Sequence, residues 1–297
     1  MDPSKPAKPI NLPAYLTVLA SVAVLLVIPL FLKKDRERFI YEKALMGTLV
    51  EITIMEGEEG AFDMAAEAAF EEIRRLEDIF SSYKPDSAVS KISIQAGGEP
   101  VSVPPEVIYV MEEALKISKL SGGAFDPTVG ALSRVWGFSG ESGYVPGKEE
   151  VEAILPFVDY TKIALDKKAG TVGLEKEGMT LNLGGVAKGY IVGKAAAVLR
   201  EKGVRRGIIK AGGDMFVFQE GIGTRPFIIG IKDPEDPSRL MGEVYVKNGA
   251  IATSGDYERF FIKDGVKFHH ILDPKTGFPA HKSRSVTIVA QNPTLAG

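Results

Sequence analysis

Residues 181–194 read L-N-L-G-G-V-A-K-G-Y-I-V-G-K, and after an amphipathic run residues 208–214 read I-I-K-A-G-G-D. The pattern predicts a short strand, a helix and a second, buried strand that ends in a sharp glycine turn. Gly184 and Gly185 precede the helix, where they allow a ligand to approach the backbone closely. The positive end of the helix dipole and Lys188 in the first turn favour an anion at the same point. An ordinary strand–helix–strand unit with glycines at its turns has the same pattern, so both interpretations stay open.

The composition excludes several kinds of site. The chain has 297 residues, with 36 basic and 39 acidic side chains and a net charge of −3, so nothing indicates a nucleic-acid-binding face. It has no cysteine, which excludes disulfides, thiolate zinc sites and a cysteine nucleophile. Its three histidines, His269, His270 and His281, fall close together near the C-terminus.

Pro13–Leu32 is a long segment without a charge. As a helix it would span about 30 Å, the thickness of the hydrocarbon core of a bilayer. K-K-D-R-E-R-F follows it directly, without a small-residue cleavage site, so we predict an uncleaved membrane anchor. The flanking basic residues are Lys5 and Lys8 before the span and Lys33, Lys34, Arg36 and Arg38 after it. Their count alone places the main domain in the cytoplasm.

The remainder of the chain has the pattern of one α+β domain. We predict an N-terminal tail at 1–12, the transmembrane anchor at 13–32, a linker at 33–43 and a single domain at 44–297. Amphipathic or apolar runs predict helices at 61–80, 105–120, 148–155 and 184–202. Short strands are predicted at 44–55, around a turn in 162–175, and at 208–211, 215–219, 227–232, 243–246, 250–253, 268–272 and 285–290. Strands mixed with three or four helices in this way predict the α+β class.

Two loops carry side chains that could contact a ligand. Tyr83 lies in S-S-Y-K-P-D-S, where its ring could stack on a flat ligand or simply pack against the protein. Asp126 lies in A-F-D-P-T-V-G, after two glycines. Its carboxylate could accept hydrogen bonds from a ligand, or it could close an Asx-turn, and both interpretations stay open.

A serine acyl enzyme is an alternative that the sequence disfavours. Ser81-Ser82-Tyr83-Lys84 fits the S-x-x-K pattern and Lys275-Thr276-Gly277 fits K-T-G. The serine of that motif should open a helix, whereas Ser81 follows one, and the second motif sits in an Asp-Pro turn rather than on a strand.

The segments together resemble the ApbE family, the FAD:protein FMN transferases. Each segment alone is a weak match, but they occur in the family's order over about residues 44–297, which makes the resemblance specific. The matching segments are M-G-T at 46–48, S-S-Y-K-P-D-S at 81–87, G-A-F-D-P-T-V-G at 123–130, L-G-G-V-A-K-G-Y at 183–190, A-G-G-D at 211–214, A-T-S-G at 252–255 and H-I-L-D-P-K-T-G at 270–277.

The resemblance implies an ApbE-like, two-lobed domain related to the T-fold and a set of site residues. The residues expected to contact the flavin nucleotide are Met46, Tyr83, Ala124, Phe125, Asp126, Lys188, His270 and Ile271, with Tyr83 stacking on it. Gly185 would offer its backbone carbonyl to Mg²⁺, and His270 would be the catalytic base.

The family's remaining metal ligands are an aspartate and a threonine in a D-A-x-x-T segment just after the last strand. This sequence reads N-P-T-L-A-G up to Gly297, before or inside that segment. We therefore expect the domain to be truncated at its C-terminus, and we assign no residue to the aspartate and threonine positions.

The activity that the resemblance implies is Mg²⁺-dependent transfer of FMN from FAD to a serine or threonine hydroxyl of an acceptor protein, with release of AMP. The acceptor would belong to a membrane redox complex, such as an Rnf- or Nqr-type subunit. The catalytic domain would then be extracytoplasmic, against the count of basic residues. Two alternatives remain: a membrane-anchored protein that binds FAD without transferring FMN, and an FAD pyrophosphatase that forms FMN and AMP.

Overall fold

The computed structural model describes residues 37–58, 60–138, 144–221, 223–236 and 238–296. From Phe39 onward the chain forms one unit. The predicted membrane anchor at 13–32 lies outside the described residues. Within the described ranges, no helix combines the length and the apolar character that crossing a bilayer requires.

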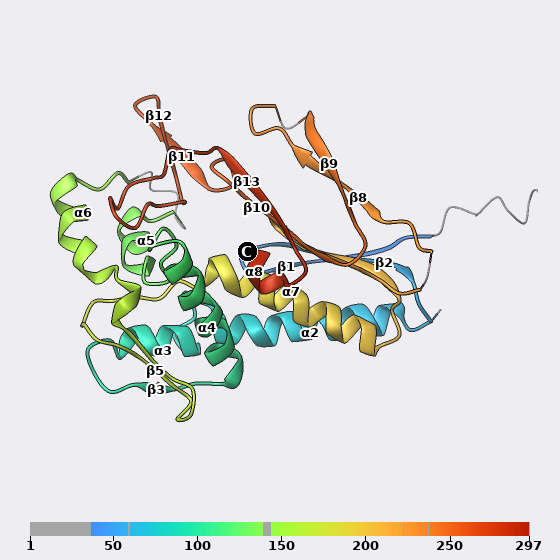
Figure 1. The fold of residues 1–297 in the computed structure, drawn as a ribbon, viewed down its shortest axis with the longest axis horizontal. Helices are drawn as coiled ribbons and strands as arrows, with labels where there is room; N and C mark the ends of the chain where they lie inside the picture. The colour runs from blue at the N-terminus through green and yellow to red at the C-terminus, as the bar shows by residue number, and fades with distance from the viewer. Residues whose placement is uncertain (1–36, 59, 139–143, 222, 237, 297) are drawn as a thin grey trace, which may run out of the picture. The chain divides into compact units, whose positions relative to one another are not determined.

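A six-stranded antiparallel sheet runs through the molecule (Figure 1). In spatial order its strands are β1 (Phe39–Leu45), β2 (Thr48–Glu56), β6 (Arg206–Ala211), β7 (Asp214–Gln219), β10 (Gly249–Gly255) and β13 (Ser285–Ala290). The register pairs Val50 with Ala211, and Asp214 with both Ala211 and Ala252. Antiparallel pairing in this register brings the β1–β2 turn, the β6–β7 turn and the middle of β10 to the same end of the sheet.

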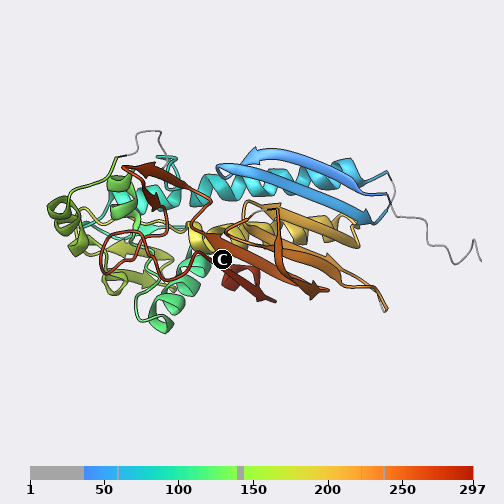
Figure 2. The same cartoon turned by 90° about the horizontal axis from the view of Figure 1, so that it is seen from above.

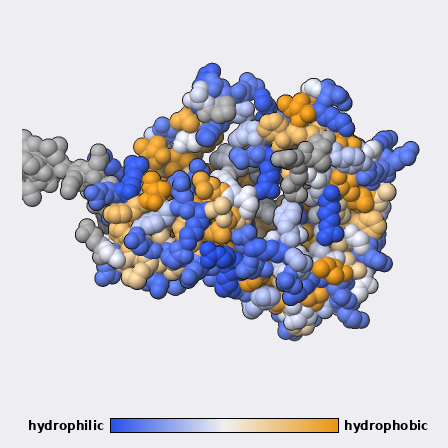
Figure 3. All heavy atoms as spheres, turned by 180° about the vertical axis from the view of Figure 1, so that it is seen from behind, coloured by the Kyte–Doolittle hydropathy of each residue, from blue (hydrophilic) through white to orange (hydrophobic). Residues whose placement is uncertain are grey.

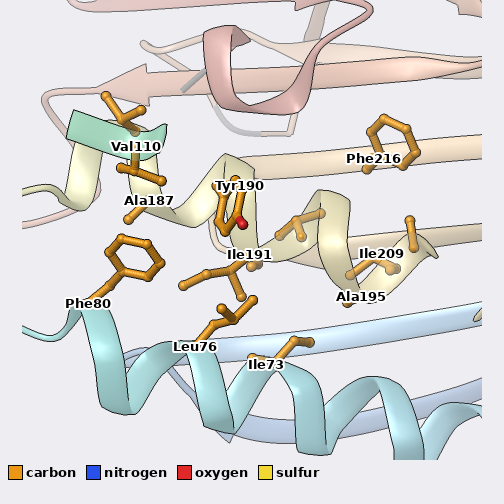
Figure 4. Packing of buried hydrophobic residues seen from close by; sticks show 14 of the residues in the cluster. Ile73, Leu76, Phe80, Val110, Ala187, Tyr190, Ile191, Ala195, Ile209 and Phe216 are labelled. Atoms are coloured by element: carbon orange, nitrogen blue, oxygen red, sulfur yellow. The ribbon is translucent and has the colours of Figure 1, made fainter. Parts of the chain in front are cut away.

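Two long helices, α2 (Phe62–Phe80) and α7 (Gly184–Glu201), lie side by side along the sheet (Figures 1 and 2). Apolar residues recur every three or four positions in α2, so one stripe of the helix is buried. Figure 4 shows Ile73 and Leu76 of α2 facing Ile191 of α7, with Ile209 of β6 beyond them. Burying each such aliphatic side chain stabilises the fold by about 1.5–3 kcal/mol.

Most of the remaining elements lie at the end of the sheet that carries the β1–β2 and β6–β7 turns (Figure 1). The helices are α3 (Ala88–Ile94), α4 (Pro105–Leu120), α5 (Gly130–Trp136), α6 (Lys148–Ile154) and α8 (Pro293–Ala296), with 3-10 turns at Leu155–Phe157 and Tyr160–Lys162. The small sheets are β3-β5-β4 (Val101–Ser102, Thr171–Leu174 and Ile163–Asp166), the hairpin β8–β9 (Phe227–Lys232 and Leu240–Val246) and the hairpin β11–β12 (Phe260–Lys263 and Val266–His269). On the face shown in Figure 3, the surface is mostly hydrophilic with separate hydrophobic patches.

A second hydrophobic cluster, separate from the core under the sheet, supports the loop after β12. Trp136 at the end of α5 is fully buried, and its ring contacts those of Phe138, Phe268 and Phe278. Its indole N–H donates to the carbonyl oxygen of Gly277 over 2.8 Å. This packing fixes the turn that follows the predicted catalytic histidine.

The structure confirms the predicted α+β class and corrects one strand. A linker was predicted over 33–43 and a strand over 44–55, interrupted at Met46–Thr48, whereas β1 begins at Phe39 and meets β2 in a hairpin. Met46 and Gly47 both have positive φ, 54° and 66°, as a tight two-residue hairpin turn requires. The interruption was not identified as a hairpin turn because a methionine rarely adopts that conformation. The short helices α3 and α5 and strand β11 were also not predicted.

Candidate active site

Two backbone turns, the middle of strand β10 and one helix N-terminus meet at one end of the six-stranded sheet. A Cβ on Gly212, in the β6–β7 turn, would lie 3.2 Å from Thr48 Oγ1 beside the β1–β2 turn. The next residue, Gly213, accepts a hydrogen bond of 3.0 Å from the N–H of Thr253 in β10. A Cβ on Gly213 would overlap the carbonyl oxygen of Thr253. Only glycine allows these two backbones to approach so closely.

The N-terminus of α7 is exposed, as an anion site requires. Gly184 and Gly185 are both exposed, and the N–H of Gly184 is capped by Asn182 Oδ1 at 3.0 Å. Lys188, one turn further, is only half-buried, and its Nζ lies 2.9 Å from Asp214 Oδ2 at the start of β7. The lysine that the sequence assigned to an anion therefore has a carboxylate partner within the chain.

The loop of residues 124–126 lies against the same helix N-terminus. A Cβ on Gly185 would lie 3.1 Å from the ring of Phe125, so these two predicted site residues are in contact. The backbone N–H groups of Ala124 and Phe125 donate to the carbonyl and hydroxyl oxygens of Ser121. The loop thus has a fixed conformation beside the glycines.

The buried carboxylate of Asp126 stabilises this loop through hydrogen bonds within the protein. Its side chain is buried, and Oδ1 accepts hydrogen bonds from the N–H and the hydroxyl of Thr128, while Oδ2 accepts from the N–H of Tyr160. The bond to the residue two positions on is the Asx-turn of the second interpretation. All three donors belong to the protein, so a contact between Asp126 and the flavin nucleotide stays a prediction.

The two remaining flavin-contacting candidates differ in exposure. Tyr83 lies in the loop after α2 with 68% of its surface exposed, so its ring is accessible to a flat ligand. Met46 is half-buried in the β1–β2 turn and packs against the core. The adjacent carbonyl of Gly47 is 3.5 Å from the guanidinium of Arg259.

His270 follows β12 directly, and Arg259 determines its orientation. The carbonyl oxygen of Arg259 accepts a hydrogen bond from the backbone N–H of His270 at 3.1 Å and lies 3.2 Å from its Nδ1. Burial lowers the pKa of His270 below its usual value; the hydrogen bond to the Arg259 carbonyl opposes this, and the positive charges of Arg259 and Lys188 add to the lowering. The ring is therefore a neutral imidazole at pH 7.

Ile271 anchors the turn that follows. Its carbonyl accepts from the N–H of Ala280 at 2.9 Å, and Asp273 accepts from the N–H of Gly277 at 2.8 Å. Gly277 has a φ of 75°, and a Cβ there would overlap Val151. Backbone hydrogen bonds within the turn and close packing of Gly277 against Val151 therefore fix its conformation.

Sequence reasoning did not assign a role to Arg259 or Thr253. Arg259 lies outside the matched motifs, in D-Y-E-R-F-F, and only the fold shows that it lies beside His270. Thr253 belongs to the A-T-S-G segment, whose spacing does not reveal that it bonds to the β6–β7 turn.

The oxygen donors for Mg²⁺ are incomplete among the described residues. A magnesium site combines one or two carboxylates with substrate phosphates and water. The structure contains no cluster of three or more His, Asp or Glu side chains suited to a metal within its described ranges. Asp214, the carboxylate beside α7, is paired with Lys188. Gly185 is the only predicted ligand present, and we therefore derive no catalytic step from a metal.

The geometry also excludes the serine acyl enzyme. Ser81 caps the C-terminus of α2 rather than opening a helix, and Lys84 Nζ pairs with Asp78 Oδ1 at 2.7 Å. A cavity of about 730 Å³ lies along the middle of α7, lined by Tyr109, Tyr190, Lys194 and Asn292 among others. None of the predicted site residues lines that cavity.

A family model supplies the decisive comparison. The model of the ApbE family matches residues 46–297, nearly the whole of the unit that begins at Phe39. The chain belongs to the ApbE family.

Two curated relatives are each named FAD:protein FMN transferase. The protein from Klebsiella pneumoniae (strain 342) is 32% identical over 86% of this chain and 78% of its own length. The protein from Treponema pallidum (strain Nichols) is 33% identical over 85% of this chain and 74% of its own length.

Solved ApbE structures have the same fold. The crystal structure of the ApbE protein from Thermotoga maritima superposes with a TM-score of 0.81, at 38% identity, over 88% of this chain and 84% of its own. The flavin transferase ApbE from Vibrio cholerae superposes with a TM-score of 0.74, at 28% identity, over the same shares of the two chains.

Proposed function

We infer that this chain is an FAD:protein FMN transferase, which moves FMN from FAD to a hydroxyl group of an acceptor protein. The observation that carries the conclusion is its similarity to curated proteins of that name over three quarters of their length. FAD is the substrate, and a protein is the second substrate.

The bonds that change are few. The hydroxyl oxygen of the acceptor attacks the phosphorus on the flavin side of the FAD pyrophosphate. The bond from this phosphorus to the bridging oxygen breaks, AMP leaves, and the proton of the hydroxyl passes to a base. The protein's contribution to such a transfer is chiefly to position the reactants and to stabilise charge.

His270 has the properties of that base. A carbonyl oxygen only accepts hydrogen bonds, so the contact with Arg259 puts the ring proton on Nδ1 and leaves the lone pair on Nε2. The lowered pKa keeps Nε2 unprotonated at neutral pH. A positioned general base of this kind contributes about 10²- to 10⁴-fold in rate.

The flavin nucleotide lies, in our proposal, across the end of the sheet. Tyr83 stacks on a ring, Met46 and the loop of residues 124–126 line the pocket, and Lys188 and Ile271 complete the contacts. Lys188 exchanges part of its interaction with Asp214 for the pyrophosphate.

Mg²⁺ dependence is a further part of the proposal. Gly185 would offer its carbonyl oxygen to the ion, which would neutralise negative charge on the phosphates of FAD. Titrating FAD into the protein with Mg²⁺ or with EDTA tests this directly. Equal FAD affinity and equal transfer rates in both conditions would remove the ion from the site.

We also propose that residues 13–32 anchor the protein in a membrane, with the catalytic domain on the extracytoplasmic side. The acceptor would then be a subunit of a membrane redox complex, such as an Rnf- or Nqr-type complex. A reporter whose activity depends on the compartment, fused after Gly297, tests the orientation.

The experiment that tests the activity uses the purified chain, FAD, Mg²⁺ and a candidate acceptor protein, with mass spectrometry of the protein and analysis of the nucleotides. An acceptor that gains FMN while an equal amount of AMP appears establishes the transferase. AMP and FMN without a labelled acceptor indicate the pyrophosphatase alternative, and bound but intact FAD indicates a binding protein.

A further inference from the structure

Arg259 connects two parts of the candidate active site. It lies just before β11, and its carbonyl oxygen holds both the backbone N–H and the ring of His270. Its side chain contacts the β1–β2 turn, where Nη2 is 3.5 Å from the carbonyl oxygen of Gly47. Arg259 thus contacts the predicted base through its backbone and the turn that carries the predicted flavin contact Met46 through its side chain.

Among the residues that the structure describes, no carboxylate compensates the charge of Arg259. Three other cations of this region have an acidic partner: Lys188 pairs with Asp214, Lys267 with Asp256, and Arg284 with Glu235 and Asp256. Arg259 is exposed, and among the residues that the structure describes no carboxylate lies within ion-pair distance of it. A guanidinium beside the candidate base, without a carboxylate partner among the described residues, is suited to a substrate anion.

The electrostatics of His270 support this placement. Burial lowers the pKa of His270 and the hydrogen bond to the carbonyl oxygen of Arg259 raises it, while the charged or titratable groups Arg259, Lys188 and His269 each lower it. The charge of Arg259 is therefore close enough to the base to affect the same reaction. Since Lys188 is largely neutralised by Asp214, Arg259 is the stronger candidate for binding phosphate next to the base.

We propose that Arg259 is a catalytic residue whose guanidinium binds the pyrophosphate oxygens of FAD and stabilises the negative charge that develops as the acceptor hydroxyl attacks. The proposal rests on the transferase function above and adds a residue to it. Arginine presents two parallel N–H donors to a phosphate, which a lysine cannot do. Removing one such donor from an enzyme typically lowers kcat by about 10²- to 10³-fold.

The test compares Arg259→Met and Arg259→Lys with wild type and with Lys263→Met. Lys263 lies on β11 and is exposed, so its replacement removes the same charge from the same hairpin at a distance from the site. Rates of AMP release and FMN transfer are measured against FAD concentration from pH 5 to 8, and the thermal midpoint of each variant is recorded.

The expected result is a fall in kcat of about 10²-fold or more for Arg259→Met, a smaller fall for Arg259→Lys, and wild-type kinetics for Lys263→Met. Because the Arg259 charge depresses the pKa of His270, the acid limb of the Arg259→Met profile should also move to higher pH. A variant that only destabilises the fold would have a lower thermal midpoint, but the acid limb of its pH–rate profile would stay at the wild-type position.

Two results would overturn the proposal. The first is a kcat within about twofold of wild type and an unmoved pH profile in Arg259→Met. The second is a rise in KM for FAD alone, which would reduce Arg259 to a residue of ground-state binding. If Arg259→Met does not fold, Arg259→Lys decides by the same criteria. Absence of transfer by the wild-type chain would instead contradict the proposed function itself.

Discussion

Lys188 Nζ and Asp214 Oδ2 lie 2.9 Å apart, and their ion pair joins the N-terminal part of α7 to the first residue of β7. The lysine is 38% exposed in its side chain, whereas the aspartate is only 10% exposed. The pair therefore has two roles. It neutralises a nearly buried carboxylate, and it holds a cation at the edge of the candidate active site.

Replacing Lys188 with Met should lower the free energy of unfolding by about 1–2 kcal/mol, because the buried Asp214 carboxylate then has no charged partner. The double variant Lys188→Met/Asp214→Asn should recover part of that loss. Urea unfolding of the two single variants and the double variant measures the coupling. Strictly additive effects would show that the ion pair contributes nothing to stability.

Gly213→Ala should be strongly destabilising, by about 2 kcal/mol or more, because the new methyl group would overlap the carbonyl oxygen of Thr253. The displaced turn should weaken FAD binding as well. Gly242→Ala is the matched control, since a Cβ there meets nothing within 4 Å. Thermal unfolding that does not distinguish the two variants would contradict this account of the turn.

His270→Ala should slow FMN transfer by about 10²- to 10⁴-fold while the dissociation constant for FAD changes little, because the ring acts on the acceptor proton. The pKa of His270 is lowered, so the wild-type rate should fall on acidification only below pH 6.5. Transfer and FAD binding are followed separately over pH. A variant as fast as wild type would remove His270 from the mechanism.

Protonation of His269 should destabilise the fold at acidic pH. His269 is 3% exposed, its Nδ1 has no hydrogen-bond partner within the described part of the chain, and burial lowers its pKa. Between the folded pKa and the unfolded value of 6.5, the unfolded chain binds more protons, so the free energy of unfolding falls as pH falls.

Replacing His269 with Phe should therefore reduce the loss of stability between pH 7 and pH 5. His281 contacts the His269 ring edge-on at 5.7 Å but is exposed, so His281→Gln is the control and should change the slope less. The slope is read from urea unfolding at several pH values. An unchanged slope in His269→Phe would assign the acid sensitivity to other groups.

Tyr83→Ala should weaken FAD binding by about 1–3 kcal/mol, the range measured for stacking of a nucleic-acid base on an aromatic ring, and Tyr83→Phe should retain most of the affinity. Because the side chain is largely exposed, neither change should affect folding. Flavin fluorescence titration measures the affinity. Equal losses in the two variants would indicate that the hydroxyl group, not the ring, makes the contact.

Much of the architecture could be predicted because its signal is local. The apolar stripe of α2 and the glycines around α7 are consequences of short-range periodicity and of backbone conformations that only glycine adopts freely. The order of seven short motifs was sufficient to indicate the ApbE family, which the comparisons then confirmed.

The β1–β2 turn could not be read in the same way, since Met46 adopts a positive φ that its residue type disfavours. Tertiary context stabilises that conformation: the hairpin is completed by pairing along β2 and β6, and Arg259 contacts the turn from 212 residues away.

By itself, the sequence determined the α+β class, the long helices, the glycine-bearing turns and the histidine after β12, because each depends on neighbouring residues. Only the tertiary structure decided which of these turns meet, that Lys188 is paired with Asp214, and that Arg259 lies beside His270. The physical reason is that these contacts depend on the antiparallel register across β2, β6, β7 and β10 and on the packing of the Trp136 cluster. Such contacts join segments far apart in the chain and leave no pattern in either segment alone.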